Sequence, residues 1–416
     1  MRICFDKREE EESRSLLNEL AELVTTLGIG VVSDQLVRAR EAQKKFLCGK
    51  GKAEEVCDHA RELKCDCIIF DNQLAPNQQR EWEEAADMTV IDREEVILDI
   101  FARRAQTREA RLQVELARME YALPRMARMW GHLDREGGGG SGGSAAARGM
   151  GEQQIEVDRR MARKRIDRIK ADLLTVRRQR ATQRKERQKT QAPHAAIVGY
   201  TNAGKSTLLN HLAGSEVLEA DMLFATLDPT TRRVALSDGQ DLLLTDTVGF
   251  VRNLPHRLVE SFKATLEEAV LADFLVHVMD ASEPELERLC GTTLKVMKEL
   301  GAADKPVLTV LNKIDLLDDP HRIKALESQF PDAVSISAKS GEGMEDLHHK
   351  FVDYLARAVS RKRYRIPQHR GDLVSLIHAE AKVLGTSYEG NDVIVEALVS
   401  RELEGRLEAD SAVGHV

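Results

Sequence analysis

Residues 195–214, AAIVGYTNAGKSTLLNHLAG, have the types and spacing that most clearly predict chemistry. Gly199, Gly204, Lys205 and Ser206 fit the phosphate-loop pattern G-x-x-x-x-G-K-[ST], between an apolar strand-like run and a helix-like run. In such a loop the backbone N–H groups surround phosphates at a helix N-terminus, and glycines allow close approach. We expect Lys205 to neutralise the β- and γ-phosphates. We expect the Ser206 hydroxyl to ligate Mg²⁺, which prefers oxygen.

A second motif, LLLTDTVGF at residues 242–250, follows about forty residues later. The apolar strand is expected to bring Asp246 to the metal side, with its contact to Mg²⁺ made through water. Gly249 is expected to turn a backbone N–H toward the γ-phosphate. Phe250 occupies the place where Ras-type GTPases have a glutamine that orients water, so we expect slow intrinsic hydrolysis. Asn202 is a candidate ligand for a potassium ion that would add positive charge in the transition state.

The segment LFATLDPTTRR, residues 223–233, lies between these two motifs. Thr226 is the candidate for a second hydroxyl on Mg²⁺, with Thr230 and Thr231 as alternatives. Lys205, Thr226 and Gly249 are therefore expected to act on the switch or the transition state, although none is assigned as a certain catalytic residue.

Two further motifs indicate that the base is guanine. In VLTVLNKIDLL, residues 307–317, the Asp315 carboxylate can accept hydrogen bonds from guanine N1–H and from its exocyclic amine. Adenine offers no such pair of donors and would leave the carboxylate unpaired. ISAKSG, residues 336–341, follows another strand and is expected to reach the O6 edge. The expected GTP contacts are Gly199, Tyr200, Thr201, Asn202, Ala203, Gly204, Lys205, Ser206, Thr207, Phe224, Ala225, Thr226, Leu227, Asp228, Asp246, Thr247, Val248, Gly249, Asn312, Lys313, Ile314, Asp315, Ser337, Ala338 and Lys339.

The elements around these motifs predict an α/β protein. Residues 1–104 alternate strand-like runs, GIGVV (28–32) among them, with helical patterns, which indicates an N-terminal α/β subdomain. Residues 191–360 form the expected P-loop GTPase domain. Residues 361–416 form a small α+β domain, with a helix over DLVSLIHAEAKVLG and a strand over DVIVEALVS. GKGK, residues 49–52, is interpreted as a structural or RNA-contacting turn.

Residues 105–190 predict a long antiparallel helical hairpin. Leu112, Leu116, Met119 and Leu123 recur at four-and-three spacing, and the same spacing recurs in a second apolar seam, Ile166, Ile169, Leu173 and Val176. Because the two seams need each other, the glycine-rich stretch 137–151 is interpreted as the hairpin tip, with a plain linker as the alternative. Basic residues dominate 158–189 and are expected to point outward, either as an RNA-binding face or as a solvated one. The candidate RNA contacts are Arg148, Arg159, Arg160, Arg163 and Lys164, with Tyr121 and Trp130 as candidate stacking residues.

Composition places limits on these interpretations. The chain has 416 residues, 31% of them charged, a net charge of −8 and six cysteines without a zinc-like spacing. No apolar run approaches the roughly 18–20 residues that span a bilayer, and the start does not have the pattern of a secretory signal. We therefore expect a cytoplasmic protein with reduced thiols. The extended hairpin favours a monomer.

The sequence resembles the HflX family of translation-linked GTPases over nearly its whole length. The resemblance is in GYTNAGKST, LFATLDPTTRR, LLTDTVGFVRNLPH and NKIDLL, and upstream in GKGKAEEV, IIFDNQLAPNQQRE, VIDREEVILDIFARRAQTREARLQVELA, MEYALPRM and RGMGEQQIEVDRR. It implies large-subunit binding, ribosome-stimulated GTP hydrolysis, and splitting or rescue of stalled ribosomes under stress. The sequence departs from the family at Met150, where the family usually has proline, and in a longer glycine loop.

Two alternatives remain at this stage. One is a GTPase that assists ribosome assembly or RNA modification. The other is a non-catalytic RNA-binding scaffold with a degenerate GTPase domain, although Lys205, Ser206, Asp246 and Asp315 are all present.

Overall fold

The computed structural model describes residues 1–136, 145–188, 193–214, 223–224, 226–236, 240–253, 263–408, 410 and 413–415. The chain divides into two compact units. The first contains residues 1–176, 220–228 and 250–264, and the second contains residues 177–219, 229–249 and 265–416. Two short pieces of the predicted GTPase domain therefore belong to the unit that holds the N-terminal subdomain and most of the hairpin.

The N-terminal part of the first unit is built from two pairs of parallel strands, β1 with β2 and β3 with β4, and the helices that cover them. Trp82 is fully buried and packs its ring against Phe46 and Phe70 at centroid distances of 5.4 and 4.9 Å. The elements are β1 (Arg2–Cys4), a 3₁₀ turn η1 (Lys7–Glu9), α1 (Glu10–Thr26), β2 (Leu36–Arg38), α2 (Lys50–Glu62), β3 (Cys67–Phe70), α3 (Pro76–Ala86), β4 (Thr89–Asp92) and α4 (Arg93–Arg104).

The prediction of a strand over 28–32 is wrong. Strand β2 begins at Leu36, and Val31 and Val32 remain 45% and 64% exposed. Gly28 adopts a φ of 74°, a left-handed conformation that ends α1 and does not continue into extended chain. The apolar residues of 28–32 lead us to expect a buried strand, but Val31 and Val32 are exposed in the structure.

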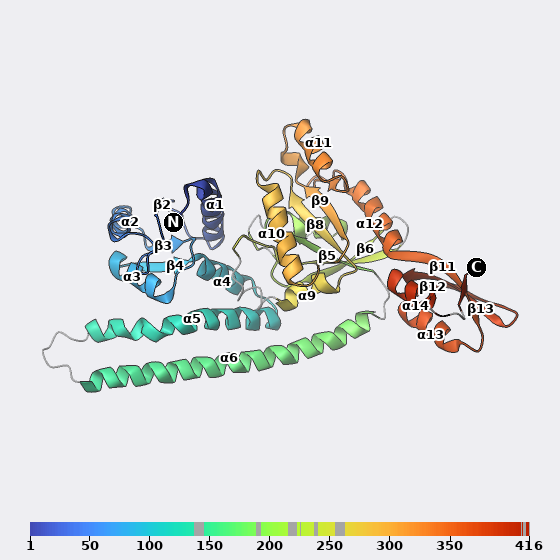
Figure 1. Cartoon of the computed structure of the whole chain (residues 1–416), viewed down its shortest axis with the longest axis horizontal. Coiled ribbons are helices and arrows are strands. Elements are labelled where there is room, and N and C mark those ends of the chain that lie inside the picture. The colour runs from blue at the N-terminus through green and yellow to red at the C-terminus, as the bar shows by residue number, and fades with distance from the viewer. Residues whose placement is uncertain are drawn as a thin grey trace. The chain divides into compact units, whose positions relative to one another are not determined.

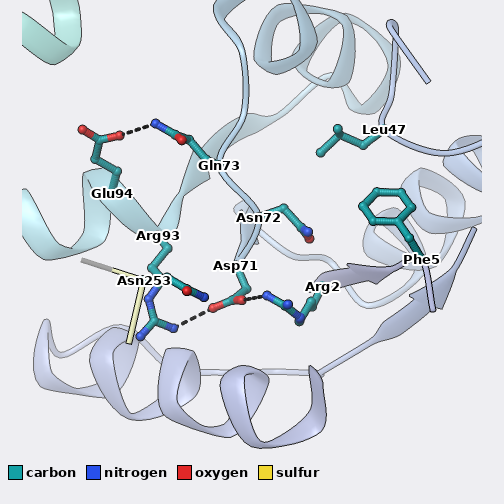
Figure 2. Close-up of a pocket in the computed structure, with 9 residues that line it drawn as sticks. All are labelled: Arg2, Phe5, Leu47, Asp71, Asn72, Gln73, Arg93, Glu94 and Asn253. Atoms are coloured by element: carbon teal, nitrogen blue, oxygen red, sulfur yellow. Dashed lines mark hydrogen bonds and ion pairs between the residues drawn. The ribbon is translucent and has the colours of Figure 1, made fainter. Parts of the chain in front are cut away.

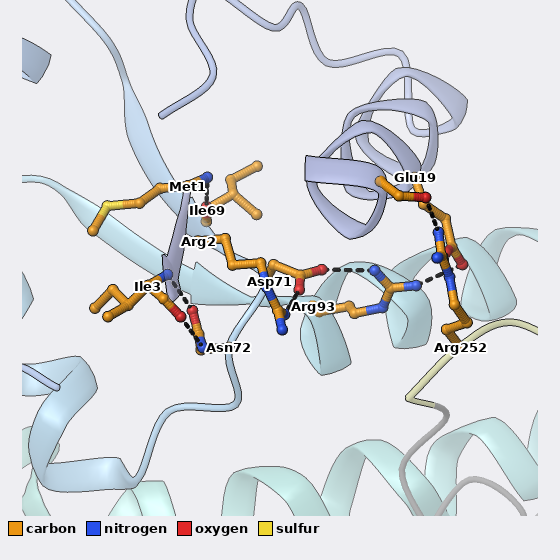
Figure 3. A network of polar contacts seen from close by, with 10 residues as sticks. Met1, Arg2, Ile3, Glu19, Ile69, Asp71, Asn72, Arg93 and Arg252 are labelled. Carbon is orange, nitrogen blue, oxygen red and sulfur yellow. Dashed lines mark hydrogen bonds and ion pairs between the residues drawn. The ribbon is translucent and has the colours of Figure 1, made fainter. Parts of the chain in front are cut away.

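A network of buried ion pairs joins α1, α4 and the segment after strand β7 (Asp241–Asp246) within the first unit (Figure 3). Arg93 donates to Glu19 at 2.7 Å and to Asp71 at 2.6 Å, and its side chain is 4% exposed. Glu19 also accepts from the Nε of Arg252 at 2.8 Å, and Arg2 pairs with Asp71. Because each buried charge has an oppositely charged partner, the network avoids the large penalty of an isolated buried ion.

The predicted hairpin is confirmed. Helices α5 (Arg108–Glu136) and α6 (Ala145–Gln188) run side by side (Figure 1). Leu116, Ile166, Ile169 and Leu173 are buried between them, and Leu112, Met119 and Leu123 pack against this cluster. Residues 145–151 were expected in the tip loop but belong to α6, because Ala145, Ala146 and Ala147 are strong helix formers. The rest of that stretch, 137–144, lies outside the described residues.

The second unit contains a six-stranded sheet in the order β10-β9-β8-β5-β7-β6, parallel except for β6 against β7. Its strands are β5 (His194–Gly199), β6 (Thr230–Ala235), β7 (Asp241–Asp246), β8 (Phe274–Asp280), β9 (Val307–Asn312) and β10 (Val334–Ser335). Its helices are α7 (Lys205–Leu212), α9 (Lys263–Leu271), α10 (Leu286–Glu299), α11 (Pro320–Gln329) and α12 (Met344–Ala358), with a 3₁₀ turn η2 (Ile314–Leu316). This is the α/β arrangement that the sequence predicts, in which loops at the carboxyl ends of parallel strands form the binding edge.

A small antiparallel sheet in the order β12-β13-β11-β14 follows. Its elements are β11 (Val359–Pro367), α13 (Gly371–Glu380), β12 (Lys382–Glu389), β13 (Asp392–Ser400), α14 (Arg401–Glu408) and β14 (Gly414–His415). The predicted helix over 372–385 ends at Glu380, and residues 382–385 belong to β12. The reason is that KVLG pairs with β13, so tertiary hydrogen bonding decides its state.

Candidate functional site

The phosphate-loop motif follows β5 and leads into α7 in the second unit, as its pattern predicts. Gly204 has a φ of 86° and immediately precedes the helix. A Cβ at this position would collide with the side-chain nitrogen of Asn312, so the residue must be glycine for steric as well as conformational reasons. Asn202 also adopts a left-handed φ, 61°, and its side chain is exposed. The backbone therefore makes a tight loop at the N-terminus of a helix, where anions are favoured.

Lys205 is the buried cation of this loop. Its Nζ donates a 2.6 Å hydrogen bond to the carbonyl oxygen of Tyr200, and the residue is 6% exposed. Burial lowers the pKa of Lys205 to about 8, partly offset by the nearby carboxylate of Asp246. An anion close to Nζ would restore the preference for the charged form. The geometry therefore favours a negatively charged group beside this lysine.

Ser206 and Asp246 form the oxygen-rich part of the site. The Ser206 hydroxyl donates to the carboxylate of Asp246 at 2.7 Å, across the first turn of α7 and the end of β7. A hydroxyl beside a carboxylate is a donor set suited to a hard divalent cation. The oxygen atoms of this pair fit the donor set that Mg²⁺ prefers.

Gly249 lies against the phosphate loop. A Cβ there would come within 2.8 Å of the Cα of Thr201 and 3.0 Å of the Nζ of Lys205. The preceding Thr247 is fully buried and donates its hydroxyl to the carbonyl oxygen of Ile197. The end of β7 is thus fixed to β5, and the backbone at Gly249 approaches Lys205 closely.

Asn312 links the phosphate loop to the loop that contains Ala338, which is predicted to reach the base. Its side-chain nitrogen donates to the Ala203 carbonyl at 2.9 Å, and its side-chain oxygen accepts from the Ala338 N–H at 2.9 Å. Asn312 is 2% exposed. The loops after β5, β9 and β10 are therefore joined by one amide side chain.

The residues predicted to reach the base differ in their exposure. Asp315 and Lys339 are exposed. Lys313 has a φ of 65° and pairs with Asp280 at 2.7 Å. Ser337 is buried, and its hydroxyl accepts from the Ser340 N–H at 3.1 Å. Sequence reasoning missed Asp280, although its position at the end of an apolar strand was an available signal.

The predicted residues 224–228 belong to the first unit, whereas Ser206 and Asp246 belong to the second. Asp228, an expected GTP contact, accepts hydrogen bonds from the backbone of Gln106 and Thr107. Phe250 is 1% exposed. Ala225 lies outside the described residues.

A pocket of about 360 Å³ lies in the first unit, where the sequence predicted no site (Figure 2). Asp71 bridges Arg2 and Arg93 at its base, and Gln73 donates to Glu94 at 2.9 Å. Asn253, from the segment after β7, also lines it. The charged side chains lining the pocket bond largely to one another.

Several basic residues of α6 are exposed, and others form ion pairs with α5. Arg160, Arg163 and Lys164 are exposed, and Arg159 is half-buried. Arg165 pairs with Glu115 of α5 at 2.6 Å, and Lys170 pairs with Glu120 at 2.8 Å. Part of the charge run therefore stabilises the hairpin. The side chains of Arg148 and Trp130 lie outside those described.

The interpretation of Tyr121 as a stacking residue is wrong. Tyr121 is 5% exposed, and its hydroxyl donates toward Asp92 at 3.0 Å and Glu95 at 3.2 Å. The guanidinium of Arg125 lies 3.4 Å from the ring centre. Burial and the neighbouring carboxylates raise the pKa of Tyr121 above its usual range. Its role is to fix α5 to the N-terminal subdomain.

Comparison with known proteins decides the family. Residues 14–102 match the family model described as GTP-binding GTPase N-terminal, residues 104–187 match the GTP-binding GTPase Middle Region, and residues 194–313 match 50S ribosome-binding GTPase. The chain is 57% identical over 415 residues to the GTPase HflX of Akkermansia muciniphila, covering 98% of this chain and 95% of that protein. The chain belongs to the HflX family. The resemblance drawn from its motifs is confirmed.

Two further relatives that are named GTPase HflX agree. The GTPase HflX of Lacrimispora saccharolytica is 43% identical over 412 residues, covering 99% of this chain and 95% of the relative. That of Escherichia coli K12 is 41% identical over 360 residues, covering 86% and 83%. The solved structure described as "crystal structure of SsGBP and GDP complex" is similar with a TM-score of 0.47 and 24% identity, covering 85% of this chain and 97% of that one. In the part of the HflX-family chain that the structure describes, no helix is long and apolar enough to cross a membrane.

Proposed function

We propose that this HflX-family chain binds and slowly hydrolyses GTP, is stimulated by the ribosome, and splits or rescues stalled ribosomes under stress. The observation that supports this best is the contact of Ser206 with Asp246 beside the buried Lys205, on a loop at a helix N-terminus. These are the parts that phosphoryl transfer requires, because its catalysis is mainly positioning and charge stabilisation.

The nucleotide roles follow from the site. Backbone N–H groups of residues 203–207 hold the phosphates, Lys205 neutralises them, and Asp315 reads the guanine. Ser206 and Thr226 would hold Mg²⁺, with Asp246 acting through water. When bound, Mg²⁺ neutralises charge that develops on the transferred phosphoryl group. The expected GTPase domain, residues 191–360, contains all of these residues.

The slow intrinsic rate is inferred from Phe250. Its buried apolar ring has no group that could orient the attacking water. Asn202, exposed and left-handed in the phosphate loop, is our candidate to hold a potassium ion. Steady-state GTP hydrolysis in potassium and in sodium tests this: we expect a higher rate in potassium, and equal rates would remove the role of Asn202.

The ribosomal role is inferred from α6 and from the family. The exposed Arg160, Arg163 and Lys164, with Arg159 and Arg148, are the proposed contacts to large-subunit rRNA. Phosphate contacts of this kind position a protein on RNA and make binding strongly salt-dependent. The protein is expected to act as a monomer in the cytoplasm, associated with ribosomes part of the time.

The decisive experiment adds the protein and GTP to intact ribosomes and measures free subunits by sedimentation. We expect subunits to appear with GTP, and GTP hydrolysis to accelerate with ribosomes. Hydrolysis without subunit release would favour the alternative, a GTPase for ribosome assembly or RNA modification. The absence of hydrolysis in both conditions would favour a scaffold with a degenerate GTPase domain.

A charge-reversal pair tests the interface. Arg160→Glu with Lys164→Glu should abolish co-sedimentation with the large subunit and leave GTP affinity unchanged. The matched control is Lys295→Glu with Lys298→Glu, two exposed lysines of α10. Unchanged ribosome binding by the α6 variant would contradict the proposed interface.

A further inference from the structure

Described residues on both sides of Thr226 are held within the first unit by their side chains. Leu223 and Leu227 are buried. The ring of Phe224 packs edge-on against Phe101 of α4 at a centroid distance of 4.6 Å. Phe224 has a φ of 55°, a conformation that costs a bulky residue energy unless its surroundings impose it. The packing therefore holds Leu223, Phe224 and Leu227, the described apolar residues around Thr226, in place.

Asp228 adds a polar anchor two residues after Thr226. One carboxylate oxygen accepts from the N–H of Gln106 at 3.0 Å and from the N–H of Thr107 at 3.1 Å. The other oxygen accepts from the Thr107 hydroxyl. Asp228 thus receives three hydrogen bonds from the residues that directly precede α5.

Thr107 is itself the N-cap of α5. Its carbonyl oxygen accepts from the Arg111 N–H at 3.0 Å, which is the first hydrogen bond of the helix, and its hydroxyl accepts from the Ala110 N–H at 3.1 Å. The same hydroxyl therefore accepts within the helix and donates to Asp228, and such chained hydrogen bonds strengthen each other. The negative charge of Asp228 also lies where the helix dipole favours it.

We propose that Asp228 is a positioning residue for Thr226, and that the N-terminal cap of the hairpin helix α5 and the engagement of Mg²⁺·GTP by Thr226 stabilise each other. This inference rests on the proposed role of Thr226 in GTP binding. A segment that is already ordered has less conformational entropy to lose when Thr226 engages the metal. By linkage, GTP binding must then stabilise the cap by the same free energy by which the cap favours GTP binding.

The first experiment measures the affinity of the full chain for GDP and for a non-hydrolysable GTP analogue, both in Mg²⁺. Asp228→Ala should lower the affinity for the analogue about 10-fold, which is the size expected for losing an N-cap interaction. The same variant should change the affinity for GDP less than about 2-fold. Asp228→Asn retains an oxygen that can accept from the two backbone N–H groups, so it should restore part of the loss. Asp99→Ala is the matched control, because Asp99 pairs with Arg118 on an exposed face of α5.

The second experiment measures hydrogen exchange at the Gln106 and Thr107 amides. In the wild-type chain these amides should exchange about 10-fold more slowly with the analogue than with GDP, by the same linkage. In Thr226→Ala the two nucleotides should give equal exchange rates. A cap with a merely structural role would give no difference between nucleotides in either chain, and that result would overturn the proposal.

Thr226→Ala also separates the two levels of inference. If this variant binds the analogue as tightly as the wild type, the assignment of Thr226 in the proposed function fails. If Thr226→Ala weakens the analogue but Asp228→Ala does not, the function stands and the positioning role of Asp228 fails. Thermal melts of all variants distinguish a local loss from unfolding.

Discussion

The side-chain amide of Asn312 donates a 2.9 Å hydrogen bond to the carbonyl oxygen of Ala203 and so fixes the loop after β9 to the loop after β5. A second hydrogen bond from Ala338 to the same side chain brings in the loop after β10. The three loops are thus joined through one side chain, and a change in Asn312 should affect the phosphate contacts and the base contacts together.

Asn312→Ala should lower the affinities for GTP and for GDP equally, by about 10-fold or more. It removes two buried hydrogen bonds and leaves the Ala203 carbonyl and the Ala338 N–H without this partner, at about 1–3 kcal/mol for each unsatisfied group. Titration calorimetry with both nucleotides measures the effect, with the exposed Asn77→Ala as control. A loss confined to GTP would contradict the idea that this residue joins the loops.

Ser206→Ala should make GTP binding independent of Mg²⁺ and lower the hydrolysis rate at least about 10-fold, since the hydroxyl is the proposed metal ligand. Ser206→Thr retains the hydroxyl and should keep most of the dependence. Nucleotide titrations at increasing Mg²⁺ check this. Normal Mg²⁺ dependence in the alanine variant would place the metal elsewhere.

Glu19→Ala should destabilise the first unit by about 3–5 kcal/mol, because it removes a carboxylate shared by the buried guanidinium groups of Arg93 and Arg252. Glu10→Ala on the same helix breaks a more exposed pair with Arg38 and should cost less than about 1 kcal/mol. Urea denaturation of both variants gives the comparison. Equal losses would mean that the network contributes no more than a surface ion pair.

Acid should destabilise the second unit partly through His277. Burial, with a smaller effect of Lys205, lowers the pKa of His277 to about 4, against about 6.5 in the unfolded chain. The unfolded chain binds the extra proton between these values, so stability falls as pH drops from about 6.5 to 4, by about 3 kcal/mol in total. His277→Leu should remove that component. Denaturation midpoints across this range test it, and parallel curves for the two chains would contradict it.

Sequence patterns predicted the local parts of this molecule well. The phosphate loop had to follow a buried strand and open a helix, because only that context places N–H groups around an anion. The two apolar seams, from Leu112 to Leu123 and from Ile166 to Val176, together predicted the hairpin, since neither can be buried alone.

Long-range contacts were not predictable in the same way. Tyr121 is an aromatic residue in a basic region, and only the fold shows that it binds Asp92 and Glu95. Asp228 lies in a motif of GTPase type, yet its partners are 121 and 122 residues away. The state of residues 382–385 depends on pairing with β13. In each case a partner distant in sequence decides the outcome, and local pattern contains no information about it.

The anchoring of Tyr121 and Arg125 to Asp92 has a mechanical consequence. A helix rises 1.5 Å per residue, so the 29 residues of α5 extend about 43 Å. Because its middle is locked to the N-terminal subdomain, α5 moves together with that subdomain as a lever and not as a hinged arm. A rotation of that subdomain by about 5° about the start of α5 would displace the far end of the helix by roughly 4 Å, which is about the spacing of adjacent side chains on a helix. A small movement at one end thus becomes a change of contacts at the other.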